Sequence, residues 1–436
     1  MAAKVDWTHP EYDAHSAQVI LVNQIYDGID EAKNLITQLS NEHNDSFATR
    51  VIQSTLDNFV ERITTTMAGQ ITRKNVSYTD VPDNIVEDMD IVAGGNNINQ
   101  FAKDITEYAV RDGQAFALVD MGIDGGQTNL HIVQREQVTN WAMNDDGLYT
   151  MVVIVEGYKE LDGRFGFEVK KQYRVIDEVG NVEIWREVEN EGWALYESIV
   201  TSYNFCPFYK LQIDDIPPLY DIAKINVKHL NFTSLRDRFL KEALDPILFG
   251  QNLGITDEGT EDNPTIILGV NQMMNTDNPD SNLSWVELDG SNYDLSEKHL
   301  LKLENDMSAR ASKIQSDSKG TKTATQVSEE NSESTSRLSD ITTDLENLIN
   351  HAVNAYSLIQ YSKELVGEVI TNRDFNSAVI DSTALGTLNT LQVSGNISKK
   401  TLLEALNNSE LVEIEDIDEE LALIEEETLA MEDEDE

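Results

Sequence analysis

One long helix dominates the pattern of the carboxyl-terminal half of this chain. Apolar side chains recur there at alternating spacings of three and four residues, which places them on a single stripe of an α-helix. The members of this stripe are Leu338, Ile341, Leu345, Leu348, Ala352, Ala355 and Ile359. The pattern predicts a helix from Ala324 to Tyr361, roughly 57 Å long at about 1.5 Å per residue, which is long for one ordinary core.

The first turns of this helix differ from the rest. Extended backwards, the same stripe meets small or polar groups rather than an apolar seam: Ser334, Asn331, Val327 and Ala324. Such a start suits a crowded and partly wet site.

Two shorter helices and a small β segment precede the long helix. Pro217-Pro218 opens the first helix, because proline fits a first helical turn, and helical spacing continues to about Leu244. Between Pro246 and Gly290, turn-rich sequence surrounds two strand-like pieces, TIILGV and LSWVELDG, which are too short for an independent core.

The second short helix follows this β segment. Ser296 is expected to cap it, and its stripe is Leu300, Leu303 and Met307. It gives way to KIQSDSKGTKT, a loop of small residues with three lysines. Two helices flanking a small insertion predict an antiparallel stalk with a tip.

The amino-terminal half predicts an α+β body. Helical patterns cover Asp30 to Ser40 and Ser46 to Met67, with Gly69 ending the second, and Ile98 to Val110 predicts another helix. Gln114 to Met121 predicts a buried strand. From His131 to Leu211 the period changes to two, and turns fall at 144–147, 162–163 and 180–181. This stretch predicts an antiparallel meander.

The charge balance limits the partners. The 436 residues include 79 acidic and 32 basic side chains, a formal net charge of −47. This disfavours a basic patch that grips nucleic acid. A wall that repels phosphates would nevertheless suit a surface along which a duplex slides. The hydrophobic content of 40% is ample for sizeable cores, and the length predicts two to four structural units.

Cysteine usage and hydropathy favour a reducing, non-membrane setting. Cys206 is the only cysteine, so an intrachain disulfide is excluded. The chain starts without a basic and apolar leader, and no run approaches 18 apolar residues, so neither secretion nor membrane spanning is expected.

Several segments carry a resemblance to a known family. They are PPLYDIAKINVKHLNFTSLRDRFLKEALDPILFG, PTIILG, WVELDG, KTATQVSEENSESTSRLSDITTDLENLINHAV, ITNRDF and SGNISKKTLLEAL, between residues 217 and 406. In this order they resemble the portal proteins of tailed double-stranded DNA bacteriophages. The amino-terminal half resembles that family in general layout.

The resemblance implies a division of the chain. Residues 1–216 would form the α+β wing, 217–245 the first stem helix, 246–293 the clip, 294–312 the second stem helix, 313–323 the tunnel loop, 324–383 the long helix and the rest of the wing, and 384–436 a helical crown with an acidic tail. The clip is short and the crown modest for the family, so the contribution of the clip to docking is open.

The resemblance also implies a function and partners. The chain would form a homo-oligomeric ring, a dodecamer, at one capsid vertex of the virion, assembled in the host cytoplasm. Double-stranded DNA would pass through it during packaging and ejection. The large terminase subunit, adaptor or tail proteins, and the major capsid and scaffold proteins would dock on it. It would use no cofactor and no membrane.

Four residues are candidates for contacts. Lys313, Lys319 and Lys322 form a local cationic set, and the tunnel-loop resemblance implies transient contact with DNA phosphates; the alternative is a set of solvated lysines that pair with acids of neighbouring subunits. Trp285 lies in the expected tip, where an indole could anchor a partner or pack in the tip's own small core.

The carboxyl-terminal end is strongly acidic. From Thr401 onward it holds no lysine or arginine, and Glu413 to Glu436 contains fourteen acids in twenty-four residues. Apolar spacing from Leu411 to Ile424 predicts a helix to about Thr428, followed by a disordered tip from Met431. A repulsive collar facing DNA and a solubilising tail both remain open.

No motif predicts catalysis. The seven histidines show no metal-ligand spacing, and neither GxxxxGK[ST] nor GxGxxG occurs. Acidic pairs such as Asp214-Asp215 and Glu329-Glu330 are unavoidable by chance among 79 carboxylates. Two rival classes stay open: another virion component, such as an adaptor or scaffold, and a metal-dependent hydrolase that uses acidic clusters.

Overall fold

The computed structural model describes residues 4–121, 126–188, 192–244, 247–251, 279–280, 282–286, 291–312, 324–373, 382–408, 417 and 420–424, and for residues 324–336 it describes only the backbone. The chain divides into two compact units, Met1–Asn372 and Arg373–Glu436, called unit 1 and unit 2 below. Helices and antiparallel sheets are both present in unit 1, so the predicted α+β class is confirmed.

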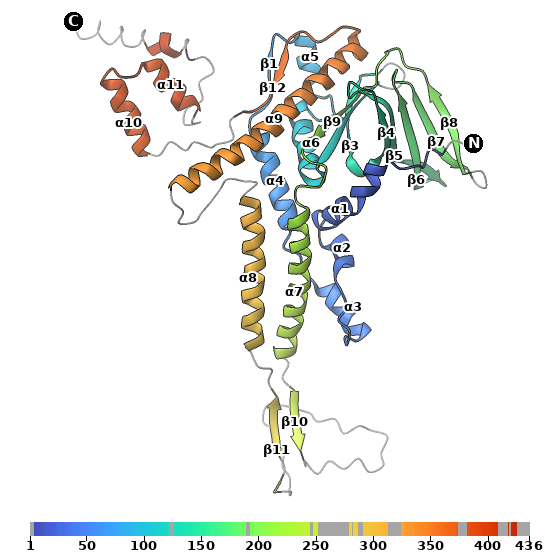
Figure 1. Cartoon of the computed structure of the whole chain (residues 1–436), viewed down its shortest axis with the longest axis vertical. Coiled ribbons are helices and arrows are strands. Elements are labelled where there is room, and N and C mark those ends of the chain that lie inside the picture. The colour runs from blue at the N-terminus through green and yellow to red at the C-terminus, as the bar shows by residue number, and fades with distance from the viewer. Residues whose placement is uncertain are drawn as a thin grey trace. The chain divides into compact units, whose positions relative to one another are not determined.

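Two antiparallel sheets form the β part of unit 1 (Figure 1). A three-stranded sheet has the order β3-β2-β9, with β2 Gln114–Asp120, β3 Asn129–Gln134 and β9 Phe208–Gln212. A five-stranded sheet has the order β4-β5-β6-β7-β8, with β4 Val138–Met143, β5 Tyr149–Asp162, β6 Gly166–Asp177, β7 Val182–Val188 and β8 Gly192–Ile199. The meander predicted from the period-two pattern is confirmed, and so is the buried strand at β2.

The predicted turns lie where the strands reverse. Gly147, Gly163 and Gly180 all have positive φ, at 80°, 67° and 83°. Positive φ is a conformation that other residues adopt only at a cost. At Gly180 a Cβ atom would also lie 2.3 Å from Tyr203 Cε2, so a side chain has no room there.

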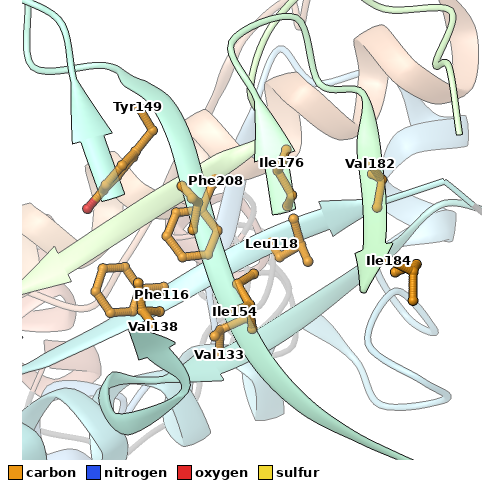
Figure 2. Close-up of a cluster of buried hydrophobic side chains, with 11 residues drawn as sticks. Phe116, Leu118, Val133, Val138, Tyr149, Ile154, Ile176, Val182, Ile184 and Phe208 are labelled. Atoms are coloured by element: carbon orange, nitrogen blue, oxygen red, sulfur yellow. The ribbon is translucent and has the colours of Figure 1, made fainter. Parts of the chain in front are cut away.

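An apolar core fills the space where the two sheets meet (Figure 2). Its members come from strands of both sheets: Phe116, Leu118, Val133, Val138, Tyr149, Val152, Ile154, Ile176, Val182, Ile184 and Phe208. The Phe116 and Phe208 rings stack with their centroids 5.0 Å apart. Arg174 on β6 adds a polar link, because it donates to Asp120 on β2 at 2.6 Å and to Glu156 on β5 at 3.3 Å.

Helices accompany the three-stranded sheet, of which α6 packs on it directly and α4 and α1 pack against α6. They are α1 Pro10–Tyr26, α2 Ile29–Ala32, the 3-10 helix η1 Lys33–Leu35, α3 Asn44–Gln53, α4 Phe59–Ile71, α5 Asp83–Asp88 and α6 Ile98–Asp112; a second 3-10 helix, η3 Arg135–Gln137, joins β3 to β4. The α6 helix confirms the prediction for Ile98 to Val110. Its end at Gly113, with φ of 84°, is the left-handed cap that glycine favours.

Three predictions for these helices were wrong. The segment from Asp30 to Ser40 is helical only to Leu35. The segment from Ser46 to Met67 is two helices, since the chain leaves α3 after Gln53 and Asn58 caps α4 by accepting a hydrogen bond from Glu61 N at 3.0 Å. Gly69 lies inside α4 and does not end it. The apolar pattern continues across the gap between α3 and α4, so it did not indicate that a second helix starts after Asn58.

The long helix α9 spans Ala324–Tyr361, as predicted. Its stripe is buried from Leu338 to Ala355, with side chains at most 4% exposed, against the three-stranded sheet and the helices α4 and α6. Polar contacts hold its carboxyl-terminal half: Asn350 bonds both backbone groups of Val369, and Gln360 Oε1 accepts from Thr128 N at 2.9 Å. The strand β12 Glu368–Ile370 then pairs with β1 Ser77–Thr79.

Unit 2 contains two described helices, α10 Ser382–Val393 and α11 Lys399–Asn408. Ser398 caps α11 by accepting a hydrogen bond from Thr401 N at 3.0 Å. Helical residues are also described at Ile417 and at 420–424. The rest of the predicted acidic helix and the predicted disordered tip from Met431 lie outside the described residues.

A pair of glycine substitutions tests the position of Gly69. Gly69 is exposed inside α4, two residues before the helix ends, with open space at its Cβ position, so Gly69→Ala should raise the free energy of unfolding by about 0.5–1 kcal/mol. Gly113→Ala should lower it by about 1–3 kcal/mol, since its Cβ would lie 2.6 Å from Asp214 O. Urea denaturation measures both, and a destabilised Gly69→Ala variant would contradict the continuous α4.

Candidate functional site: the paired helices α7 and α8

The helices α7 and α8 form the stalk that the sequence predicts. The α7 helix spans Tyr220–Leu244 and α8 spans Ser291–Ser312, and the two run side by side (Figure 1). Between them in the chain stands a two-stranded sheet of β10 Ile247–Gln251 and β11 Asn282–Val286, paired antiparallel. We call α7 and α8 the stalk.

Side-chain contacts align the two helices in antiparallel register. Arg236 Nη1 donates to Glu297 Oε1 at 3.0 Å, and His229 Nε2 lies 3.2 Å from Glu304 Oε1. The Phe232 and His299 rings meet edge to face with centroids 4.5 Å apart. In these pairs the residue number on α8 decreases as the residue number on α7 increases, so the two helices are antiparallel, as predicted.

The first half of α7 is fixed in unit 1 by buried polar contacts. Asn226 is fully buried, accepts from Phe59 N at 3.0 Å and donates to Asp57 O at 2.9 Å. Asn231 Oδ1 accepts from Thr37 N at 2.9 Å. These amides satisfy backbone groups at the ends of neighbouring helices, so they fix the position of α7 as well as stabilising it.

A buried ion cluster adds to this attachment. The Glu42 side chain has no exposed surface and accepts from Arg50 Nη2 at 2.7 Å and from Arg238 Nη1 at 2.9 Å. Arg50 Nη1 also donates to Ser234 on α7 at 2.8 Å. Hydrogen bonds from Arg50 lower the pKa of the Glu42 carboxyl from its ordinary value of 4.5 to about 2. The cluster links the segment before α3 to the middle of α7.

Burial then changes along the stalk. Ser234 is the last fully buried residue of α7 whose side chain is described, and on α8 full burial begins only at Leu300. The half of the stalk that adjoins β10 and β11 therefore has partly exposed apolar side chains instead of a closed core. Leu295 in this half is 68% exposed.

Two expectations for the stalk were wrong. Ser296 does not cap α8, which begins at Ser291; its hydroxyl donates to Tyr293 O at 3.0 Å inside the helix. The strand β10 directly after Pro246 was not predicted, and its partner β11 coincides with the start of the strand-like LSWVELDG. The other piece, TIILGV, lies outside the described residues.

The predicted contact residues are only partly placed. Trp285 lies on β11 opposite Leu248 in the register. Lys313, Lys319 and Lys322 belong to the segment between α8 and α9 and lie outside the described residues. The DNA contact of the three lysines and the anchoring role of Trp285 therefore stay predictions.

Metal-binding and reactive side-chain types lie apart from one another in the described part of the chain. No group of three or more His, Cys, Asp or Glu side chains there could hold a metal ion. The Cys206 thiol is mostly enclosed, and burial raises its pKa to about 12, so at neutral pH it is the protonated and unreactive form. His9 and His43 accept hydrogen bonds from Glu11 N and Asp45 N at helix starts.

Among the helices that the structure describes, none has the length and apolar character needed to cross a membrane.

Comparisons with known proteins cover the same region. A family model described as a domain of unknown function, DUF4055, matches residues 218–357, from the start of the stalk into α9. No curated protein matches the chain.

Solved structures are similar over most of the chain at low identity. One, described as the virion of a native gene transfer agent particle, has a TM-score of 0.44 at 11% identity, covering 80% of this chain and 89% of that chain. The neck of an empty gene transfer agent particle, computed with C6 symmetry, has a TM-score of 0.38 at 11% identity, covering 85% and 95%. The neck of the native particle, computed with C12 symmetry, also has a TM-score of 0.38 at 11% identity, covering 80% and 89%. With TM-scores below 0.5, these similarities assign no function to this chain.

The Glu42 cluster predicts how the stalk attachment depends on pH. Because the folded chain lowers the Glu42 pKa, the stabilisation is complete above about pH 4.5 and is lost as the pH falls towards 2. We expect Glu42→Gln to lower the free energy of unfolding by about 3 kcal/mol at pH 7. This deficit should shrink as the pH falls below 4.5, measured by denaturation at several pH values. Asp30→Asn, which breaks an exposed pair with Lys33, is the control and should change little; a deficit that is independent of pH would contradict the assignment.

Proposed function

We propose that this chain is a portal protein, a subunit of the ring at one capsid vertex through which double-stranded DNA enters and leaves a tailed-phage virion. The observation that carries the proposal is the stalk: it is anchored in unit 1 at one end, stands next to a small β unit at the other, and leaves its far half open. A helix of 38 residues follows it in the chain.

A ring supplies what the stalk lacks. Leu295 in the far half of the stalk is 68% exposed, and an apolar side chain at such a position gains stability when a neighbour covers it. A ring results when each copy contacts the next head to tail and the rotation from copy to copy returns to the first one. Twelve copies are the number that the portal resemblance implies.

The parts of the ring follow from the chain order. We assign residues 1–216 and 324–383 to the wing, 217–245 and 294–312 to the two stem helices, 246–293 to the clip, 313–323 to the tunnel loop and 384–436 to the crown. The clip would dock the terminase large subunit and then the adaptor or tail proteins, with Trp285 as an anchor. The wing and crown would face the capsid and scaffold proteins.

The charge of the chain fits passage rather than adhesion. Each copy adds a formal charge of −47, so a bore lined by these acids would repel phosphates, and a duplex would move along it without being held. The lysines at 313, 319 and 322 would supply brief phosphate contacts within this acidic surface. The proposal needs no catalytic group in this chain, since the motor that hydrolyses nucleotide would be a docked partner.

Electron microscopy of the purified protein tests the ring. Negative staining in about 0.15–0.5 M salt should show closed rings with a central hole. At about 0.01 M salt the Debye length grows to about 30 Å, repulsion between copies reaches further, and the rings should dissociate. Monomers at every salt concentration would refute the proposal, and open or solid particles would favour an adaptor or scaffold.

Neutral substitutions test the role of the loop lysines. We expect the combined change of Lys313, Lys319 and Lys322 to Gln to leave rings intact and to reduce the DNA retained in a packaging assay several-fold. The matched control changes Lys4, Lys363 and Lys399 to Gln, which alters the net charge equally. Equal DNA retention in both variants would assign the loop lysines to subunit contacts or solvent.

A further inference from the structure

The strands β5 and β6 extend beyond the sheet that they belong to. Pairing with β4 ends at Ile154 on β5, and pairing with β7 begins at Gln172 on β6. From Gly157 to Lys171 the two strands therefore pair only with each other, out to the turn at Gly163. We call residues 157–171 the arm. Two strands without a third strand or a covering helix are marginally stable in water, so the arm lacks a partner.

One face of the arm is apolar and exposed. Side chains alternate between faces along a strand, and the register sets Leu161 opposite Phe167 and Lys159 opposite Val169 on the same face. Leu161 is 82% exposed, Phe167 is 59% exposed and Val169 is 63% exposed. Single exposed apolar residues are ordinary on protein surfaces, but three adjoining ones on a two-stranded arm form a docking surface.

Two lysines that form no ion pair with a described carboxylate border this face. Lys159 Nζ lies 4.9 Å from the centroid of the Phe167 ring, and Lys171 Nζ lies 4.8 Å from that of Tyr173. Neither lysine forms an ion pair within the part of the chain that the structure describes. On the opposite face, Lys170 is paired with Glu160 and lies 3.8 Å from Glu168. The charges of the arm are therefore sorted by face.

The charge of the arm is opposite to that of the chain. Four basic and three acidic residues lie between 157 and 171, a formal charge of +1, whereas the whole chain carries −47. Because the chain has 79 acidic residues, a second copy offers many carboxylates. Lysines next to an apolar patch would complement a surface that carries them.

We propose that this face of the arm docks on a carboxylate-bearing surface of a second copy of the chain. Leu161, Phe167 and Val169 supply the buried apolar area, and Lys159 and Lys171 select an acidic rim. The contact is head to tail, because the arm of one copy meets a different surface of the next. This inference rests on the ring proposed above and names the element that joins its copies.

Duplex DNA fits this face less well than a protein does. Leu161 and Val169 are aliphatic and offer no ring on which a base could stack, and two lysines supply few phosphate contacts. An acidic protein surface with its own apolar side chains matches both components. DNA binding by the arm is one of the outcomes that the experiment distinguishes.

Charge reversal on the arm tests the inference. The double variant Lys159→Glu, Lys171→Glu keeps the apolar residues and the turn, and Lys4→Glu, Lys399→Glu is a control with the same change in net charge. Mass photometry of each variant across a protein dilution series should show wild type and control forming rings alike. The arm variant should need at least tenfold more protein to assemble, with an unchanged circular dichroism spectrum.

A photo-crosslinker at the arm identifies the occupant without disturbing the fold. Phe165 at the tip is 85% exposed, so benzoylphenylalanine placed there should give a covalent product with the mass of two copies. Lys159→Glu, Lys171→Glu should abolish this product.

The outcomes separate the two proposals. Rings that assemble equally well in the arm variant, with no crosslink between copies, would overturn the arm contact and leave the ring standing. A wild-type chain that stays monomeric removes both. Loss of duplex binding in a fluorescence anisotropy titration, with assembly unchanged, would reassign the face to DNA and likewise overturn the contact between copies.

Discussion

The fold depends on one helix that serves two packing environments. The first half of α7 lies among the helices of unit 1, where Asn226 and Asn231 bond backbone groups and the Glu42 cluster reaches Ser234. Beyond Ser234 the described side chains of α7 are only partly covered, although Arg238 still reaches the buried Glu42. A continuous helix transmits the orientation fixed in its first half to its second half. The buried polar contacts therefore determine where the stalk and the β unit next to it are held.

Electrostatics limits how such a chain can associate. Most of its charge is negative, and several of its arginines are already committed: Arg50 to Glu42, Arg111 to Asp112 and Arg174 to Asp120 and Glu156. Association between copies would have to overcome repulsion, so it would need apolar contact together with cations that form no ion pair within the described residues. The arm and the open half of the stalk supply apolar surface, and Lys159 and Lys171 supply unpaired charge.

Elements whose buried residues recur at a regular spacing could be predicted from the sequence. Elements that begin or end at one particular contact, such as a helix cap, could not. The α9 stripe was readable because one face of the helix packs against the same neighbours over many residues, and β5 and β6 were readable from their period of two. The α1 helix was missed because only its last turns bury apolar residues, Val19, Val22 and Ile25. Pro10 with acidic Glu11 and Asp13 was the signal that could have located its start. The break before α4 depends on the Asn58 cap, which an unbroken apolar pattern conceals.

The candidate site was predictable in order but not in detail. Two helices around a β insertion followed from proline positions and stripes, whereas the early start of α8 and the strand β10 did not. The open face of the arm could not be found from alternation alone, because Leu161 and Phe167 follow the same pattern as the buried Val153 and Tyr173. Only the register and the ends of β4 and β7 show where the covering neighbours stop.

If neighbouring copies cover the far half of the stalk, its backbone should be protected only in the assembled protein. Hydrogen–deuterium exchange at residues 235–244 and 293–299 measures this on assembled and on dissociated protein. We expect slow amide exchange there in the assembled state and at least tenfold faster exchange after dissociation, while residues 222–230 stay protected in both. Equal protection of the far half in both states would show that the stalk is complete within one chain, and would contradict the account.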